Sequence, residues 1–331
     1  MINSGVEATL SPAFMSAIRR FGRASRVRLE KTQKSNAVTA TLYHYTDREA
    51  LKGIVEKQQF WFTHYQHLND DTELEFGMNA AKAVLAEIGA RIPKAKLFCE
   101  MVDDLFSNEN MRSTFGFYIA SFSRNRDDPH QWKNYAQGGE GFAIGLGPQL
   151  FGVDEKPNRK PHENIFVSPV HYGAAAARIQ HLPAIESAAR ISAETVERRV
   201  KAMNGINRWC IPFFREMANS LIAGELILNS LIVKNSGWAP EHEVRLVIFG
   251  EVEKLKPSVL ARPRGTKTVP YIKSDMPIQQ PGNIVEIVIG SRAPDDAEDF
   301  ACELLAPFHS NPSSIIRRST HDLTMHQTYP D

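Results

Sequence analysis

The sequence has little of the residues and segments that would assign it to a class at once. Its 331 residues include only three cysteines, at positions 99, 210 and 302, which lie far apart with no C-x-x-C spacing. A disulfide framework or a cysteine-built zinc site is therefore not expected, and a reducing cytoplasm fits best. No segment approaches the ~20 consecutive apolar residues of a membrane-spanning helix, so no membrane partner is expected. A formal net charge of only +1 gives the whole chain no general attraction to nucleic acid.

Residues 1–36 differ in composition from the rest. They contain seven arginines and lysines against two glutamates, together with several serines. No apolar core of ~7–15 residues is present, which excludes a secretory signal peptide. We expect residues 1–38 to be a basic, flexible leader, with an export signal that delivers the protein as an effector into a host or target cell as the alternative. Residues 39–331 are long enough to bury a core and are expected to form one domain.

Hydrophobic periodicity and turn residues predict a mixed order of elements. Strands are expected at 41–46, 60–63, 115–122, 142–146, 167–172, 244–249 and 284–289. Helices are expected at 47–55, 75–90, 129–136 and 294–305, and residues 182–235 look mostly helical. This order is neither the regular alternation of a doubly wound sheet nor an all-β pattern. It predicts an α+β fold with a mixed, split β-sheet and an inserted helical segment at about 174–236.

The most informative segment runs from Trp238 to Arg245, where a turn containing proline becomes an apolar strand. Glu241 and Glu243 stand at positions i and i+2, so strand alternation would point them to the same side. Like charges so close raise one another's proton affinity, which is common at sites of acid, base or cation-stabilising chemistry. The alternative is a solvated strand entrance with surface ion pairs that contribute about 0–1 kcal/mol each.

Three blocks of sequence resemble a bacterial family of uncharacterised domains, some of whose relatives are associated with phage-defence and toxin-like loci. The first is Asn69-Asp-x-x-Glu73, where the family tends to have proline after the Asn-Asp pair and this chain has Asp71. The second is Ser121-Phe-Ser123, followed by Trp132-x-x-Tyr135 and the glycines at 138–141, and the third is Trp238-x-x-Glu-x-Glu-x-Arg245. The order and spacing of the blocks fit the family over about residues 41–290, and this resemblance brings no activity.

The opening of the chain also resembles the ADP-ribosyltransferases of the His-Tyr-Glu class, whose fold has a split mixed sheet. In that class a histidine on the first strand, an aromatic on or after the second and a glutamate opening the fifth surround the nicotinamide ribose of NAD. The matching positions here are His44, Tyr65 (with Phe62 as its rival) and Glu243, and Tyr45 neighbours the histidine. Glu241 would be the upstream carboxylate of the E-x-E turn found in another branch of the superfamily.

The resemblance implies roles for these residues. Breaking the nicotinamide–ribose bond builds positive charge on the sugar, which Glu243 would stabilise in the transition state, while neutral His44 would fix a ribose hydroxyl. Tyr65 or Phe62 would stack on nicotinamide. Glu241 would act as base on the acceptor or on water. Each also has a structural alternative as an ordinary core residue.

Three further residues are candidates for NAD contacts. Arg245 would contact a pyrophosphate oxygen or pair with Glu243, and the pairing is the stronger expectation. Trp132 and Tyr135 lie at i and i+3 on one face of a helix, where packing is the alternative. No metal site is expected at His64 and His67.

One other segment is basic: Arg262-Pro-Arg264 with Lys267 could touch RNA or DNA, but it lacks interleaved aromatics and could be a solvated hairpin.

The resulting hypothesis is a toxin or effector that consumes NAD as its substrate and transfers ADP-ribose to a protein or nucleic acid, a mono-ADP-ribosyltransferase. An antitoxin, immunity protein or chaperone would be a natural partner. Two alternatives stay open. One is an NAD glycohydrolase (NADase), with water as acceptor, and the other is a non-catalytic module that binds a nucleotide or a partner protein.

Overall fold

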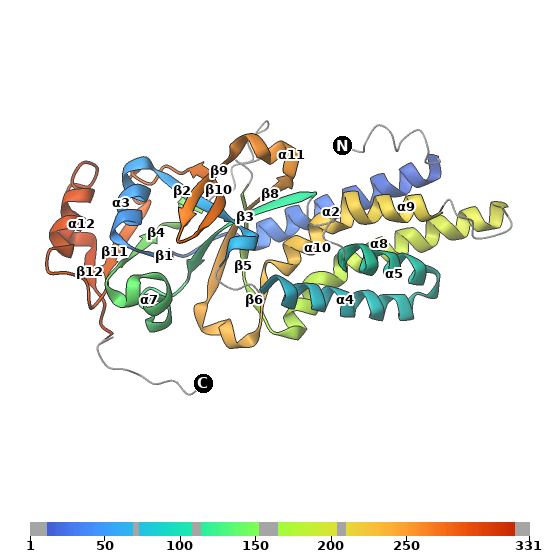
Figure 1. Cartoon of the computed structure of the whole chain (residues 1–331), viewed down its shortest axis with the longest axis horizontal. Helices are drawn as coiled ribbons and strands as arrows, with labels where there is room; N and C mark the ends of the chain where they lie inside the picture. The colour runs from blue at the N-terminus through green and yellow to red at the C-terminus, as the bar shows by residue number, and fades with distance from the viewer. Residues whose placement is uncertain (1–11, 69–72, 108–113, 152–164, 204–209, 322–331) are drawn as a thin grey trace.

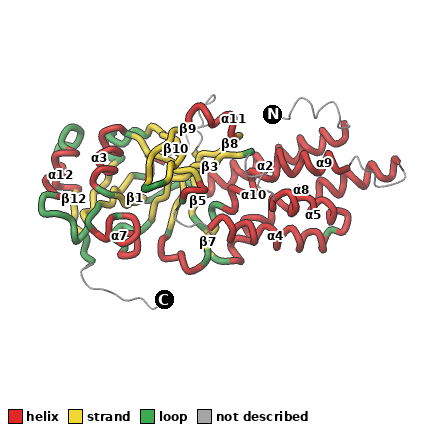
Figure 2. The backbone as a smooth tube through the Cα atoms, viewed as in Figure 1, coloured by secondary structure: helices red, strands yellow, loops and turns green. Residues whose placement is uncertain are grey.

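The computed structural model describes residues 12–68, 73–107, 114–151, 165–203 and 210–321 (Figure 1). The molecule is elongated, with a β-sheet and its covering helices at one end and a group of long helices at the other (Figure 2). The expected mixed α+β class is confirmed. In the described part of the chain no helix is both long and apolar enough to cross a membrane.

Ten of the described strands form one mixed sheet, and two short strands form a separate parallel pair. The sheet contains β1 (Leu42–Thr46), β2 (Gln59–His64), β3 (Phe115–Ser123), β4 (Phe142–Leu146), β5 (Ile165–Pro169), β8 (Glu243–Glu251), β9 (Val259–Arg264), β10 (Lys267–Asp275), β11 (Ile284–Ile289) and β12 (Ile316–Arg318). The pair is β6 (His171–Tyr172) with β7 (Val233–Lys234). The strand order in the ten-stranded sheet is β12-β11-β4-β1-β3-β2-β10-β9, and β8 lies between β3 and β5.

The sheet splits at β3. Strand β8 pairs with β3 along its whole length, from Phe115 to Ser123, and so occupies one edge of β3. The other edge is shared, because β1 pairs there only at Ser123, while β2 pairs only at Ile119 and Tyr118. Strands β1 and β2 therefore diverge from a common neighbour, and the space between them opens a cleft.

Short helices cover the sheet: α3 (Arg48–Lys57), α7 (Pro129–Tyr135), α11 (Val252–Leu255) and α12 (Ala297–Leu305). Two of them begin as the sequence predicts. The Asp47 carboxylate accepts from the Ala50 amide at 2.7 Å, and the Asp128 carboxylate accepts from the His130 amide at 2.8 Å. Pro129 stands at the first helical position of α7, where its missing N–H leaves no helical hydrogen bond unmade.

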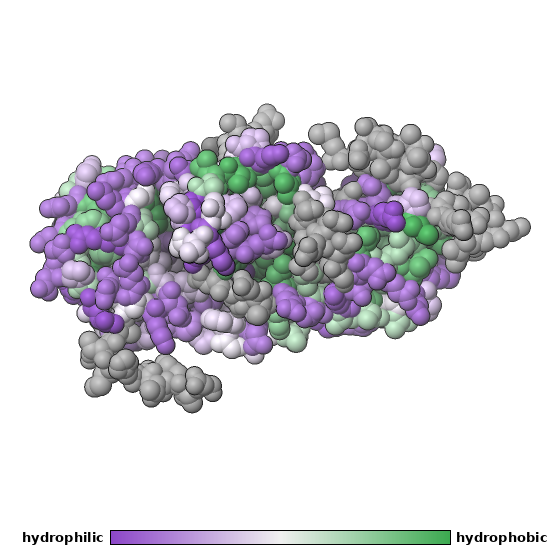
Figure 3. Space-filling model, viewed as in Figure 1, coloured by the Kyte–Doolittle hydropathy of each residue, from purple (hydrophilic) through white to green (hydrophobic). Residues whose placement is uncertain are grey.

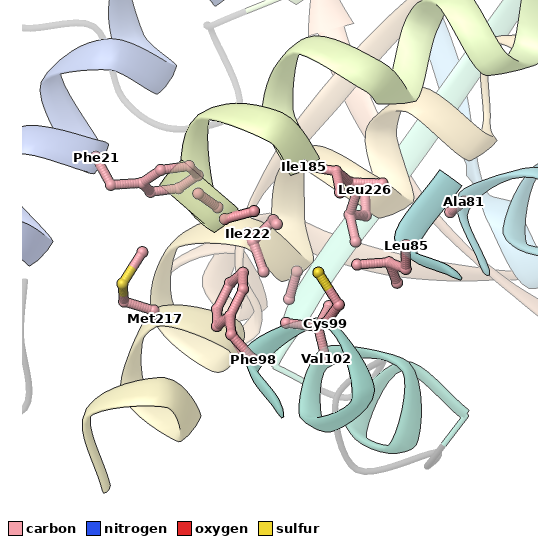
Figure 4. Close-up of a cluster of buried hydrophobic side chains, with 14 of the residues drawn as sticks. Phe21, Ala81, Leu85, Phe98, Cys99, Val102, Ile185, Met217, Ile222 and Leu226 are labelled. Carbon is pink, nitrogen blue, oxygen red and sulfur yellow. The ribbon is translucent and has the colours of Figure 1, made fainter. Parts of the chain in front are cut away.

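The far half of the molecule is helical: α2 (Pro12–Ser35), α4 (Glu73–Arg91), α5 (Lys96–Ser107), α8 (Ala174–Met203), α9 (Cys210–Met217), the π-turn η6 (Ala218–Ile222) and α10 (Ala223–Ser230). The helical insertion expected at about 174–236 is present as α8 to α10. It packs on α2, α4 and α5, however, so the helical half is assembled from three parts of the chain. Figure 4 shows Phe21, Leu85, Phe98, Ile185 and Leu226 from these parts meeting in one buried cluster.

The expectation of a flexible leader is wrong for residues 12–35, which form helix α2. Phe14, Ile18 and Phe21 lie on one side of it and are buried against the helical half. The Arg28 guanidinium also makes a two-pronged ion pair with the buried Glu225 carboxylate, both distances being 2.9 Å. Apart from Arg28, the basic residues of this helix are exposed, and the charge count concealed its apolar stripe. Residues 1–11 of the leader lie outside the described residues, as do Asn69 and Asp70.

Candidate functional site

A cavity of about 620 Å³ lies at the split in the sheet. Its walls come from β1, β2, β3, α3, β8, β9 and the 3-10 turn η7 (Ser236–Glu241). The volume falls within the ~300–1,000 Å³ typical of small-molecule sites. His44, Glu241 and Glu243 all border it, so the structure brings together the three residues to which the sequence assigned catalytic roles.

The two carboxylates and the histidine reach this cavity from different faces of the sheet. Tyr43 is paired with Ser123, and Ser123 with Glu243, so these three residues share one face. His44 alternates with Tyr43 and points to the opposite face, where its ring lies 5.4 Å from the rings of Phe60 and Phe122. In a continuous sheet the two faces would be separated. Here the divergence of β1 and β2 lets one cavity border both.

Glu241 and Glu243 converge because a turn leads into the strand, and not because both alternate along one strand as expected. Glu241 ends the turn η7 instead of lying in the strand, and His242 follows in the left-handed region with φ of 44°. The turn is fixed by its own hydrogen bonds: the Asn235 side chain accepts from the Gly237 amide at 3.0 Å, and the Ser123 hydroxyl donates to the Glu241 carbonyl at 2.8 Å.

A lysine lies between the two carboxylates. The Lys234 ammonium donates to Glu241 at 2.7 Å and lies 2.6 Å from a Glu243 oxygen. Arg245 donates to both oxygens of Glu243, at 2.8 and 3.2 Å, and to the Leu231 carbonyl. The four charged residues are 1–6% exposed, so the site is a buried cluster of two anions and two cations. The alternative of a solvated strand entrance does not describe it.

The cations reverse the expected effect on proton affinity. Burial raises the pKa of Glu243, but the charges of Arg245 and Lys234 outweigh it and lower that pKa to about 2. The expectation that the neighbouring carboxylates raise one another's proton affinity is therefore wrong for Glu243. Its carboxylate is an anion at any pH at which the protein would work.

Hydroxyl groups complete the cluster. The Tyr135 hydroxyl donates to Glu241 at 2.9 Å, and the Tyr172 hydroxyl accepts from the Glu243 amide at 2.9 Å. Each of the four carboxylate oxygens therefore has a partner within the chain. Tyr135 lines the cavity as well, so it is placed at the site in the way the sequence predicts.

His44 is held as a neutral imidazole. Its Nδ1 lies 3.0 Å from the Ser121 carbonyl oxygen, which can only accept, so Nδ1 carries the proton and Nε2 is left as an acceptor. Burial lowers the pKa of His44, although the Ser121 hydrogen bond opposes that shift. The ring orientation is fixed by β3 and by the two phenylalanines.

The remaining candidates separate into two groups. Tyr45 lines the cavity and donates to the Asn125 carbonyl at 2.9 Å. Phe62, Tyr65 and Trp132 do not line it; each is at most 5% exposed and packs in the interior. Trp132 packs edge-on against Tyr45 with ring centroids 4.8 Å apart, which is the packing alternative.

Sequence reasoning gave no site role to Lys234 or to two exposed tryptophans that border the cavity, Trp61 and Trp238. Trp238 lies beside the charge cluster, with the Lys234 ammonium 5.5 Å from its ring centroid. The signal for Lys234 was a single cation at the end of the apolar run from Leu226, where burial is expected and an unpaired charge is not tolerated.

A family model described as "Protein of unknown function (DUF2971)" matches residues 131–246, about a third of the chain. The matched segment contains Trp132-x-x-Tyr135 and the whole stretch from Trp238 to Arg245. This agrees with the expected resemblance to a family of uncharacterised domains. None of the curated proteins and none of the solved structures matches the chain.

Proposed function

We propose that the chain is an NAD-consuming enzyme that breaks the nicotinamide–ribose bond and transfers ADP-ribose to a macromolecule. The observation that carries the proposal is one cavity at the split of the sheet, bordered by His44 from the first strand and by Glu241 and Glu243 from the turn and strand that follow the helical insertion. This is the arrangement that the ADP-ribosyltransferase resemblance implies. The resemblance of the fold itself to that class is part of the same proposal.

The ionised state of Glu243 suits this chemistry. When the C1′–N bond breaks, its electron pair leaves with nicotinamide, and positive charge develops on the ribose. A carboxylate with a pKa of about 2 remains an anion throughout and stabilises that charge more than it stabilises neutral ribose. A permanently ionised group is poorly matched to proton transfer at neutral pH, so the role of Glu243 is electrostatic.

The other residues then take distinct roles. Glu241 is the candidate base that accepts the proton of the acceptor as the acceptor attacks C1′. His44 accepts a hydrogen bond from a ribose hydroxyl through Nε2. Arg245 donates to Glu243 and to the Leu231 carbonyl, so its role is to orient the carboxylate and not to contact a pyrophosphate oxygen. Tyr65 and Phe62 lie outside the cavity, so the candidate that stacks on nicotinamide is Trp238, which lines the cavity beside the charge cluster.

One observation favours a second candidate, a non-catalytic module that binds a nucleotide. Both carboxylates have all their oxygens hydrogen-bonded within the chain, which is also what a structural cluster requires. In an enzyme, substrate would have to compete with Lys234 or Arg245 for Glu243. The two candidates differ in turnover and share NAD binding.

The test is nicotinamide release from NAD by the wild-type protein and by Glu243→Gln, with and without cell extract. We expect the variant to lose at least about a hundredfold in rate. His44→Ala, which leaves the charge cluster intact, should also lose most of the rate. Glu253→Gln, whose side chain is 82% exposed in the sheet half, is the matched control and should keep full activity.

The destination of ADP-ribose separates the remaining alternatives. Label recovered on protein or nucleic acid supports the transferase, and free ADP-ribose supports the NADase. Binding of NAD by calorimetry without release of nicotinamide, alone or with extract, would refute the enzyme and leave the binding module.

A further inference from the structure

A second surface with a distinctive composition adjoins the cavity on the outer strands of the sheet. Register places Lys273 opposite Trp61 and Tyr271 opposite Thr63, across β10 and β2. It places Arg262 opposite Val269 and Arg264 opposite Lys267, across β9 and β10. Because paired and alternate residues share a face, one side of β2, β10 and β9 carries the set that we call the basic-aromatic face: Trp61, Thr63, Arg262, Arg264, Lys267, Tyr271 and Lys273.

Trp61 lies at the centre of this face. The Arg262 guanidinium is 5.2 Å and the Lys273 ammonium 5.8 Å from its ring centroid. The buried Tyr271 ring lies 4.6 Å away, tilted by 31°, and supports the indole from within. Trp61 is still 37% exposed, so an indole with two cations over its ring reaches solvent. Figure 3 shows strongly hydrophilic and pale residues over the part of the surface where Figure 1 places β9 and β10.

The positive charge of the face is largely uncompensated. Among the described residues, no carboxylate forms an ion pair with Arg262, Lys267 or Lys273. The acidic residue at the end of the face, Asp275, accepts a hydrogen bond from Gln59 at 2.7 Å. Arg262 donates to Thr63 at 3.1 Å, while its Nε is buried with no partner. Arg262 and Lys273 beside the indole, with Lys267 further along the same face, therefore favour an anionic ligand with planar groups.

We propose that the basic-aromatic face binds single-stranded nucleic acid. The cations would neutralise backbone phosphates, and a base would stack on Trp61, the combination that single-strand binding surfaces use. An acidic peptide would satisfy the charges but would offer no ring to the exposed indole. The basic hairpin lacks interleaved aromatics in sequence because Trp61 is supplied by β2, some 200 residues away.

The basic-aromatic face continues into the cavity, so bound nucleic acid would be led toward it. Trp61, Thr63, Arg262 and Arg264 line the cavity as well as the face, so a strand bound there leads into the split of the sheet. If the proposed NAD chemistry holds, nucleic acid is the acceptor that this surface would present. Binding itself does not depend on that chemistry and is tested without NAD.

The test is fluorescence anisotropy with a labelled 20-mer of oligo(dT), titrated at several salt concentrations. With up to three phosphates neutralised by Arg262, Lys267 and Lys273, the slope of log K against log salt should approach about −2, from ~0.7 per phosphate. Lys267→Ala with Lys273→Ala should make the slope shallower by about 1.4. Trp61→Ala should weaken binding about tenfold or more while leaving the slope unchanged.

Two controls make the result decisive. Lys94→Ala with Lys96→Ala removes two exposed charges from the helical half and should leave binding unchanged. A polyglutamate peptide should compete much more weakly than unlabelled oligo(dT). Absence of binding at low salt, equal losses in the two double variants, or equal competition by polyglutamate would each overturn the proposal.

Discussion

Replacing Lys234 with methionine tests the buried charge cluster directly. The methionine fills a similar volume, but the cluster changes from two anions and two cations to two anions and one cation. Removing one member of a buried ion pair typically costs about 3–5 kcal/mol, because the remaining charges lose their compensation in a region with little water. All four charged side chains here are at most 6% exposed, so that range applies.

The loss translates into a measurable shift in melting temperature. With an unfolding entropy of ~2.1 cal/mol/K per residue, the 331 residues give about 0.7 kcal/mol/K. A cost of 3–5 kcal/mol then lowers the melting temperature by about 4–7 °C, measured by circular dichroism. Lys254→Met is the control, because that lysine pairs with Glu251 at 2.7 Å on the surface, where such a pair contributes about 1 kcal/mol or less.

The pH dependence supplies an independent check. The pKa of Glu243 falls from 4.5 in the unfolded chain to about 2 in the native protein. The unfolded chain therefore binds more protons in this interval, and about 3 kcal/mol of stability is present above pH 4.5 and lost as the pH falls toward 2. In Lys234→Met the pKa of Glu243 rises toward 4.5, so urea unfolding should show a smaller acid loss that is complete at a higher pH.

A second substitution distinguishes charge imbalance from lost packing. Lys234→Met with Glu241→Gln returns the cluster to one anion and one cation, and it should be more stable than Lys234→Met alone. The reasoning is refuted if the single variant melts with the wild type, or if the second substitution only adds its own loss.

Other variants test packing and burial elsewhere. Gly77→Ala should destabilise the helical half by about 1–3 kcal/mol in urea unfolding, because a Cβ there would lie 2.4 Å from the Ser230 Cα. A Cβ at Gly53 would meet nothing within 4 Å, so Gly53→Ala should stabilise α3 by up to about 1 kcal/mol in the same measurement. Burial lowers the pKa of His181 from 6.5 to about 4. Neutral His181 therefore contributes roughly 3 kcal/mol to the free energy of unfolding above pH 6.5, and this contribution is lost as the pH falls from 6.5 to 4. An NMR titration that gives an ordinary pKa would contradict this. Phe21→Ala should cost about 3–5 kcal/mol, measured by urea unfolding, if α2 is a docked helix, and almost nothing if it is a flexible leader.

Local elements were predictable because their signals are local. Strand β4 has the bounds that the glycine turn before it and its apolar run indicate, and α7 begins where Asp128 and Pro129 place it. Helix α2 was missed because its stripe of Phe14, Ile18 and Phe21 lies among seven basic residues, and charge dominated the composition. Strand β7 is only two residues long, too short for any periodicity.

The site was predictable in its carboxylates and only partly in its surroundings. Two glutamates at i and i+2 are visible in the chain, but the cation that lies between them is not, because its position depends on how the turn η7 folds back. Similarly, no periodicity reveals that His44 points to the opposite face from Glu243; that follows from the pairing register of β1 with β3. Aromatic residues near a site in sequence were poor guides, since Tyr65 and Phe62 pack inside while Trp61 faces outward.

The helical half and the site are physically connected through the two ends of the insertion. Strands β6 and β7 pair with each other where the chain leaves and re-enters the sheet half. Each brings one group to the cluster: Tyr172 binds the Glu243 amide, and Lys234 lies between the carboxylates. The sheet alone would therefore hold two buried anions with one cation, an arrangement that burial penalises. For this reason the helical insertion is part of the site, and loosening its packing should alter the charge cluster before it unfolds the sheet.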